Sequence, residues 1–296
     1  MGDAEAADRF HSWSTRRTGR HRMTEPIGFV GAGQMGEPMV HRLLAAGHPV
    51  TVYARKTEVR QRLQEAGAVA VDRIADAVQN QRIVICCLFS DDQLRDVTLG
   101  GDGLLAHCAS GTVVLSHTTG AVTTLRELAS ARTDITVLDA PISGTAEDIA
   151  NGRLTVMIGG PSEAVDAAAT VVDAYAATVL RTGGLGSALN LKLVNNVLFA
   201  ANAQLLSAAV TVATDLGIDA NSFLDALAAC SADSKVAGHA RAIGGISPFT
   251  ELAAPFLRKD VDAALAAATE AHTDLGLLYD VVARGPLPLT SAETRR

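Results

Sequence analysis

Short apolar segments alternate with segments of helical periodicity through the first 185 residues of the chain. Eight apolar runs of four to eight residues have the length and composition of strands. They are residues 27–30, 50–54, 68–71, 82–89, 112–116, 135–140, 154–160 and 177–183. Helical patterns lie between several of them, at residues 35–46, 57–66, 121–131 and 162–175. This alternation is typical of βαβ units and predicts an α/β fold built on a doubly wound parallel sheet.

The pattern becomes entirely helical after a glycine-rich stretch at residues 183–186. Residues 186–216 predict one long helix, and Asp219 is the expected N-cap of the next helix, at residues 221–230. Further helices are expected at residues 235–243 and 259–283, the last with a break near residues 274–276. The chain therefore divides into a tail at residues 1–24, an α/β domain at 25–185 and an all-α domain at 186–296.

The long helix is the element that links the two domains. At 1.5 Å per residue it spans about 45 Å, which exceeds the width of a small domain. A second copy of the chain is the expected cover for its far apolar face. The sequence thus predicts a homodimer or homotetramer.

One lysine interrupts the apolar sequence of this helix. Lys192 and Asn196 are four residues apart and therefore share one face, and Ala200 and Ala203 continue the same stripe. A cation and an amide would then face one place. The alternative is a core lysine whose aliphatic stem covers apolar surface while its ammonium group reaches water.

The amino-acid composition argues against nucleic acid and membranes as partners. The 296 residues are 48% hydrophobic and 19% charged, with a net charge of −7. This balance argues for a soluble, cytoplasmic protein and against nucleic acid as a partner, because phosphate binding needs clustered basic surface. The longest apolar runs are interrupted by Lys192, Asn195, Asn196 and Asp215, so no membrane-spanning segment is expected.

The cysteines and the N-terminal segment add no chemistry of their own. The four cysteines lack the spacing of metal ligands, so no metal site is expected; they are Cys86, Cys87, Cys108 and Cys230. The adjacent Cys86 and Cys87 lie inside an apolar run and are expected to be small core residues in a reducing compartment. The first 23 residues carry scattered charge without an apolar core, so they are not a secretory signal. A disordered tail is expected, carrying Arg16, Arg17, Arg20 and Arg22, or an extension before a start at Met23.

A glycine-rich loop directly follows the first strand and opens the first helix. Its pattern is G-x-G-x-x-G, formed by Gly31, Ala32, Gly33, Gln34, Met35 and Gly36. The first glycine suits a tight turn, the second allows backbone to approach a pyrophosphate, and the third allows helix and strand to pack closely. This context predicts a Rossmann-type dinucleotide-binding domain, with phosphates at the helix N-terminus. The alternative is a glycine-rich turn that binds nothing.

The end of the second strand indicates which dinucleotide binds. NAD enzymes usually place an acidic residue there for the ribose 2′-hydroxyl. This chain has Ala54, followed by Arg55 and Lys56. With no carboxylate to repel a 2′-phosphate and two cations to receive it, NADP(H) is expected over NAD(H). The alternative is that both cations belong to a solvated helix start.

Four motifs in order resemble the β-hydroxyacid dehydrogenase family, which includes 3-hydroxyisobutyrate dehydrogenase, tartronate semialdehyde reductase and glyoxylate/succinic semialdehyde reductase. The opening IGFVGAGQMGEPMVHRLLAAGHPVTVYAR resembles the family's cofactor motif. DAPISGTAEDIANGRLTVMIGG at residues 139–160 resembles its substrate motif, and LKLVNNVL at 191–198 its catalytic motif. LRKDVDAAL at 257–265 resembles its second cofactor motif.

The resemblance implies an oxidoreductase that interconverts a small hydroxy acid and its semialdehyde, with a carboxylate-bearing substrate. It implies that Lys192 is the general acid/base and that Asn196 helps to hold the substrate. Ser143 and Gly144, with Thr145 beside them, would receive the substrate carboxylate. The remaining implied residues contact the cofactor: Leu88, Phe89, Thr119 and Lys259.

Three positions depart from the family pattern and bear on the substrate. The usual Gly-Gly after the motif serine is Gly144-Thr145, and the usual Ser-Thr with a proline three residues on is replaced at residues 118–122. A C-terminal proline segment is replaced at residues 271–278. Two alternatives remain on the same fold: an imine reductase and a non-catalytic cofactor-binding scaffold. Imine reductases and non-catalytic scaffolds of this fold usually lack a lysine at the position of Lys192.

Overall fold

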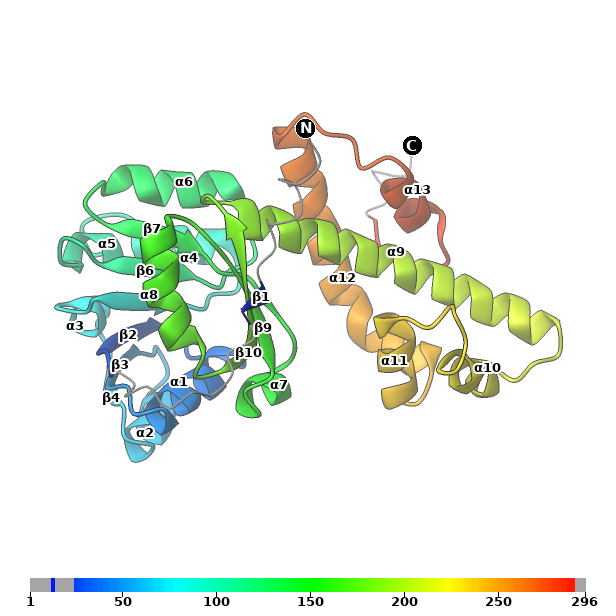
Figure 1. Cartoon of the computed structure of the whole chain (residues 1–296), viewed down its shortest axis with the longest axis horizontal. Helices are drawn as coiled ribbons and strands as arrows, with labels where there is room; N and C mark the ends of the chain where they lie inside the picture. Colours follow the sequence, from blue (N-terminus) through cyan, green and yellow to red (C-terminus); the bar gives the residue numbers. More distant parts are fainter. Residues whose placement is uncertain (1–11, 14–23, 291–296) are drawn as a thin grey trace, which may run out of the picture. The chain divides into compact units, whose positions relative to one another are not determined.

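The computed structural model describes Ser12–Trp13 and residues 24–290 (Figure 1). The chain forms two compact units, of which the first ends at Lys192 and the second begins at Leu193. The first unit is built on one mixed sheet. Its strands are β1 (Ser12–Trp13), β2 (Ile27–Val30), β3 (Val50–Tyr53), β4 (Val69–Val71), β5 (Ile83–Cys86), β6 (Val113–Ser116), β7 (Thr136–Asp139), β8 (Ile142–Ser143), β9 (Leu154–Gly159) and β10 (Ala176–Gly183).

Six of these strands form the parallel sheet that the sequence predicts. Their order is β4-β3-β2-β5-β6-β7, and every neighbouring pair among them is parallel. Counted from β2, this is the order 3-2-1-4-5-6 of a dinucleotide-binding fold. The direction of strand order reverses between β2 and β5, and ligands of such sheets bind where the strands at this reversal end.

Beyond β7 the parallel sheet continues into antiparallel pairs. Strand β9 pairs antiparallel with β7 and with β8, and β10 pairs parallel with β9. A parallel connection needs a crossover of a dozen or more residues. Only ten residues, 144–153, separate β8 from β9, and they contain the five-residue helix α7 (Ala146–Ala150). The chain therefore turns back on itself instead of crossing over.

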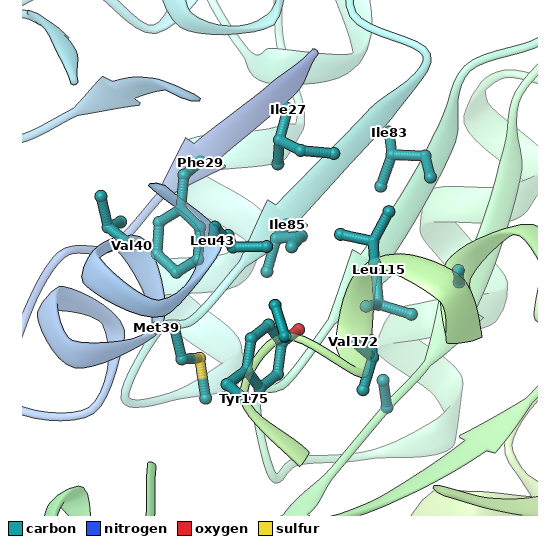
Figure 2. Close-up of a cluster of buried hydrophobic side chains, with 14 of the residues drawn as sticks. Ile27, Phe29, Met39, Val40, Leu43, Ile83, Ile85, Leu115, Val172 and Tyr175 are labelled. Carbon is teal, nitrogen blue, oxygen red and sulfur yellow. The ribbon is translucent and has the colours of Figure 1, made fainter. Parts of the chain in front are cut away.

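Helices cover both faces of the sheet because the central strands are apolar on both sides. In β5, Ile83 and Ile85 face one core, whereas Val84 and Cys86 face the other. Figure 2 shows the first core, where side chains of β2, β5 and β6 meet those of α1 and the end of α8. The covering helices are α1 (Gly36–Ala45), α2 (Thr57–Glu65), α3 (Ile74–Val78), α4 (Asp91–Thr98), α5 (Leu104–His107), α6 (Val122–Ala131) and α8 (Ser162–Val172).

The second unit is helical, as predicted. The long helix α9 (Ser187–Asp215) carries the chain into it. The others are α10 (Ala220–Leu227), α11 (Lys235–Ala242), α12 (Ile246–Glu270) and α13 (Leu277–Arg284). Asp219 caps α10 by accepting the Ser222 N–H at 2.9 Å, as the sequence predicts. The predicted break near residues 274–276 is also confirmed, because α12 ends at Glu270 and α13 begins at Leu277.

The predicted start of α12 at residue 259 is wrong. The helix begins thirteen residues earlier, at Ile246, and it contains Pro255. A proline inside a helix removes one hydrogen bond and favours a helix end before it, which is why the sequence pattern misled. Packing outweighs that cost here, since Phe249 and Leu257 on either side of the proline are both buried in the core of the second unit.

Within the second unit, the side chain of Gln204 bonds α9 to α13 and to the segment that follows α13. Its side-chain amide donates to the carbonyls of Val282 and Leu287, both at 2.8 Å, and its oxygen accepts the Leu287 N–H at 2.7 Å. The side chain is 1% exposed. A buried amide with its hydrogen bonds made holds the segment after α13 against the long helix.

Helix α9 also has the length and hydropathy of a membrane span, contrary to the sequence expectation. Its most apolar window has a mean hydropathy of 1.6, and half of that window is buried inside the protein. The core helices of soluble proteins have the same length and hydropathy.

The predicted N-terminal tail lies mostly outside the described residues. Residues 1–11 and 14–23, which include the four arginines noted above, are not described. Within the same segment, Ser12–Trp13 forms β1 and pairs antiparallel with β10.

Candidate functional site

Four predicted ligand-binding segments follow neighbouring strands, and the main chain ties them to one another just past the strand ends. Cys87 N–H donates to Val30 O at 2.9 Å, His117 N–H to Cys86 O at 2.8 Å, and Ala140 N–H to Ser116 O at 2.7 Å. These bonds place the segments after β2, β5, β6 and β7 side by side at the carboxyl edge of the sheet. That edge is where open α/β sheets bind their ligands.

The glycine loop has the geometry that its sequence predicts. Gly31 has φ of 103°, and a Cβ there would collide with the carbonyl oxygen of Cys87. A Cβ at Gly36 would collide with the carbonyl oxygen of Gly31, so only glycine allows helix and strand to pack this closely. At Gly33, by contrast, no atom of the described residues lies within 4 Å of a built Cβ. The second glycine therefore opens onto free space, as the approach of a pyrophosphate requires.

Helix α1 presents its N-terminus to that space. Among the described residues, no side chain caps it at Met35, and the adjoining Gly33 and Gln34 are exposed. Uncapped N–H groups at a helix start favour an anion. These residues fit a dinucleotide phosphate.

Arg60 adds a further cation to the two after β3 that the sequence reading singled out. Arg55 and Lys56 are exposed. The guanidinium of Arg60 donates to the carbonyls of Ala54 at 2.8 Å and Arg55 at 3.0 Å, and to the Thr57 hydroxyl at 3.0 Å. Arg60 thereby fixes the turn that carries the other two cations.

The segments after β5 and β6 are joined by a carboxylate. Leu88 and Thr119 are half-buried, whereas Phe89 is 64% exposed. Asp91, at the start of α4, accepts the N–H of Ala121 at 2.7 Å. Its other oxygen is buried and has no hydrogen-bond partner among the described residues. Asp91 thus holds together two segments that the sequence assigns to the cofactor.

The predicted substrate segment ends in a helix cap. Ser143 is half-buried in β8, and Gly144 has φ of 137°, a backbone conformation that favours glycine. Thr145 is the N-cap of α7: its hydroxyl accepts the Asp148 N–H at 3.2 Å, while its own N–H and hydroxyl donate to Asp148 Oδ2, both at 2.9 Å. These bonds hold the pKa of Asp148 below its usual value. The threonine that departs from the family pattern therefore has its hydroxyl engaged within the loop.

A buried carboxylate at the end of β7 caps the long helix. Asp139 is 0% exposed and accepts the N–H groups of Gly186 and Leu189, both at 2.8 Å. Burial raises the pKa of Asp139, against which the N–H donors act. The start of α9 is thus fixed to the strand that leads into the substrate segment. Sequence reading missed Asp139, although its position at the end of an apolar run, directly before Ala140-Pro141, is a usable signal.

Lys192 lies three residues after the last of these capped positions. It is half-buried, and Asn196, one turn further along α9, is 6% exposed. Ala200 and Ala203 are completely buried, so the predicted stripe does share one inward face. Asn195 donates to the Asn196 side-chain oxygen at 3.2 Å, which orients that amide. Lys259 is half-buried in α12 of the second unit, and its role near the nicotinamide stays a prediction.

The geometry agrees with the comparisons to known proteins. Residues 26–184 match the NAD-binding domain of 6-phosphogluconate dehydrogenase, and residues 186–283 match the NAD-binding domain of NADP-dependent 3-hydroxyisobutyrate dehydrogenase. The chain belongs to the 3-hydroxyisobutyrate dehydrogenase family. It is an NAD(P)-binding oxidoreductase with the Rossmann-type domain and helical second domain of that family.

Several individual proteins are similar to this chain in sequence or in structure. An uncharacterized oxidoreductase of Shewanella frigidimarina is 34% identical over 211 residues, which cover 70% of this chain and 72% of the relative. The NAD-dependent L-serine dehydrogenase of Pseudomonas aeruginosa is 38% identical over 176 residues, 59% of each protein. The structure of 3-hydroxyisobutyrate dehydrogenase from Mycobacterium tuberculosis with L-serine has a TM-score of 0.77 at 25% identity, covering 88% of this chain and 92% of that one. An imine reductase from a Pseudomonas species, at 22% identity, shares the fold alone.

Proposed function

We propose that this enzyme interconverts a small β-hydroxy acid and its semialdehyde with NADP(H), and that Lys192 is the general acid/base. The observation that carries the proposal is the linkage around Asp139. One strand end caps the helix that bears Lys192 and also leads directly into Ser143 and Gly144. A proton donor and a receiving site for a carboxylate are therefore supported by the same residue.

The side chains divide the chemistry as follows. The bound dinucleotide supplies or accepts the hydride at the substrate carbon. As the carbonyl is reduced, the ammonium group of Lys192 donates a proton to the oxygen and stabilises its developing charge; in oxidation the neutral amine accepts that proton. The Asn196 amide, buried one turn away, holds the substrate by hydrogen bonding.

The carboxylate of the substrate is received after β8. Ser143 supplies a hydroxyl and Gly144 a main-chain N–H from a conformation that glycine adopts readily. Thr145 completes the segment through its capping box with Asp148, which fixes the turn at the start of α7. A small carboxylate-bearing substrate suits this arrangement, and relatives that act on 3-hydroxyisobutyrate and L-serine support the class.

The preference for NADP(H) rests on the turn after β3. Arg55 and Lys56 are exposed there and Arg60 holds the turn in place, while Ala54 replaces the usual acidic residue. Two cations without a competing carboxylate favour a 2′-phosphate. NAD(H) remains the cofactor to compare, since one relative is described as NAD-dependent.

We also propose that a second copy of the chain covers the outer face of α9. Val194, Leu198, Leu205 and Val212 are each about half exposed or more, at 54%, 49%, 56% and 56%. At 100° per residue these four positions fall within a narrow stripe, on the side of the helix opposite Lys192 and Asn196. Large apolar side chains aligned along one helix are typical of a subunit interface.

A substrate panel tests the activity. Purified enzyme with NADPH or NADH is offered glyoxylate, succinic semialdehyde, methylmalonate semialdehyde and cyclic imines, and in the oxidative direction 3-hydroxyisobutyrate and L-serine, and absorbance at the nicotinamide band is followed. We expect turnover of at least one carboxylate-bearing aldehyde, faster with NADPH. Turnover of cyclic imines instead would establish the imine-reductase alternative. Bound NADPH without any turnover would establish the scaffold alternative.

A further inference from the structure

A buried histidine lies where three parts of the first unit meet, and the proposed chemistry does not use it. His117 directly follows β6 and is 4% exposed. Its Nδ1 lies 2.5 Å from the carbonyl oxygen of Ala140, and its Nε2 lies 2.9 Å from the hydroxyl of Tyr175. The Tyr175 ring meets the imidazole edge-on, with centroids 5.8 Å apart at an interplanar angle of 82°. Figure 2 shows Tyr175 within the apolar core below β2 and β5.

The partners fix which nitrogen carries the proton. A carbonyl oxygen only accepts, so Nδ1 must be the donor to Ala140. In the neutral ring Nε2 is then the acceptor, and the Tyr175 hydroxyl donates to it. Burial lowers the pKa of His117 to about 4, so the neutral ring is the form present at neutral pH. Both ring nitrogens are satisfied in a single tautomer.

The two ends of this linkage lead to different ligand segments. His117 is followed by Thr118 and Thr119, the segment assigned to the cofactor, and Ala140 is followed by the segment that ends in Ser143 and Gly144. Ala140 is held at both of its main-chain polar groups, because its N–H donates to Ser116 and its carbonyl accepts from His117. Since Ala140 is completely buried, water cannot replace a lost donor without cost.

In this chain, side-chain hydrogen bonds hold the segment after β6. The family commonly has a proline three residues after the threonine of this segment, whereas this chain has Val122, preceded by Gly120 and Ala121. A proline would restrict the backbone by itself. Here side-chain hydrogen bonds hold both ends of the segment. At one end Asp91 accepts the N–H of Ala121, and at the other end the His117 ring donates to the carbonyl of Ala140.

We propose that His117 is a positioning residue that fixes the cofactor segment at Thr118 and Thr119 to the substrate segment beginning at Ala140. The Tyr175 hydroxyl donates to Nε2 and so stabilises the tautomer that the bond to Ala140 requires. This inference rests on the proposed function, since it takes the two segments to be the cofactor and substrate sites.

Four variants separate positioning from simple core packing. His117→Met keeps an apolar side chain of similar size but cannot donate to Ala140. His117→Asn keeps a donor near the Nδ1 position and gives up the bond to Tyr175. Tyr175→Phe keeps His117 in place without the hydroxyl donor. Val172→Ala is the matched control, because it opens the same core and lies at the end of α8, outside both ligand segments in the sequence.

Three quantities are measured for each variant well below its melting temperature: the NADPH dissociation constant by fluorescence without substrate, and kcat and KM for the best aldehyde of the panel. We expect His117→Met to raise the substrate KM and the NADPH dissociation constant about tenfold or more, because small displacements of binding groups are costly. His117→Asn should return both to within about threefold of the wild type, and Tyr175→Phe should lie between the two. Val172→Ala should lower the melting temperature and leave both constants within about twofold.

The outcomes distinguish the two proposals. If His117→Met melts lower but keeps both constants, or if Val172→Ala changes them equally, His117 only packs the core and the inference is wrong. If the wild type binds NADPH but reduces nothing in the panel, the proposed function fails, while the dissociation constants still test positioning at the cofactor segment. Should His117→Met not fold, ¹⁵N NMR of the wild-type imidazole decides: a proton on Nδ1 supports the linkage, and a proton on Nε2 alone overturns it.

Discussion

The carboxylate of Asp139 accepts the main-chain N–H of Leu189 at 2.8 Å, three residues before Lys192. The same carboxylate accepts the N–H of Gly186, also at 2.8 Å, so it satisfies two of the N–H groups that a helix start leaves without intrahelical partners. The positive end of the helix dipole lies at this N-terminus and also interacts favourably with a negative charge on Asp139. The position of Lys192, the proposed proton donor, therefore depends on a strand that ends about 50 residues earlier.

Replacing Asp139 should cost both stability and turnover. In Asp139→Asn the side-chain NH₂ must face a main-chain N–H that now lacks an acceptor, and an unsatisfied buried donor costs about 1–3 kcal/mol. We expect urea denaturation to show a loss of that order in the free energy of unfolding, together with a lower kcat. Asp134→Asn is the control, because Asp134 pairs with Arg132 at the surface. Equal stability of the two variants would contradict the capping role.

Lys192→Ala should lose catalysis while keeping the cofactor. Positioned acid–base help is worth about 10²–10⁴-fold in rate, so kcat should fall by at least the lower figure. NADPH binding, followed by fluorescence, should change little, because the glycine loop and the turn after β3 are intact. Lys235→Ala, an exposed lysine at the start of α11, serves as the control and should retain wild-type kcat. Near-normal turnover of Lys192→Ala would remove the lysine from the mechanism.

The turn after β3 should decide the cofactor. Arg55→Ala combined with Lys56→Ala removes two charges from the proposed 2′-phosphate site. We expect the KM for NADPH to rise about 10- to 100-fold, with little change in the KM for NADH. Ala54→Asp should lower NADPH use further by repelling the phosphate. Arg82→Ala tests the effect of removing a cation elsewhere, since Arg82 lies before the amino end of β5. An unchanged ratio of NADPH to NADH efficiency would show that the two cations are only a solvated helix start.

His117 should make the protein acid-sensitive below pH 6.5. Burial lowers its pKa from 6.5 to about 4, so between these values the unfolded chain binds a proton that the folded chain does not. The free energy of unfolding therefore falls as the pH drops through this window, by about 3 kcal/mol in total at 1.36 kcal/mol per pH unit. Tyr175 and Cys87 lie nearby and stay neutral throughout, because burial raises the pKa of each.

The measurement for this prediction compares urea unfolding of the wild type and His117→Asn at pH 7.0, 5.5 and 4.0. Carboxylates titrate in both proteins, so the quantity of interest is the difference between their pH slopes. The wild type should lose more stability than the variant between pH 6.5 and pH 4. Parallel slopes would mean that His117 is protonated in the folded protein as easily as in the unfolded one.

The outer stripe of α9 should hold two subunits together. A charge at its centre, as in Leu205→Glu, should shift sedimentation at micromolar concentration toward the monomer without lowering the stability of the subunit, because Leu205 is 56% exposed. Thr214→Glu adds the same charge to an exposed position on another side of the helix and should leave the assembly unchanged. A wild type that sediments as a monomer would rule out the interface.

The sequence by itself determined the features that depend on neighbouring residues. The glycine loop, the apolar strands and the shared face of Lys192 and Asn196 follow from periodicities of a few residues, and each is found in the structure. The cap of α10 at Asp219 was predictable for the same reason, because its hydrogen bond spans three residues.

Only the tertiary structure decided the features that join distant parts of the chain. The bonds of Asp139 span 47 and 50 residues, and those of His117 span 23 and 58. The antiparallel return of β9 and the start of α12 ahead of Pro255 likewise depend on how the chain packs. An apolar run can mark Asp139 as a candidate, but no local pattern identifies the distant groups to which Asp139 or His117 bonds, because those groups lie far away in the sequence. The sequence therefore indicated the residues proposed for the chemistry of this enzyme, and the fold brought Asp139 and His117 to the segments that carry them.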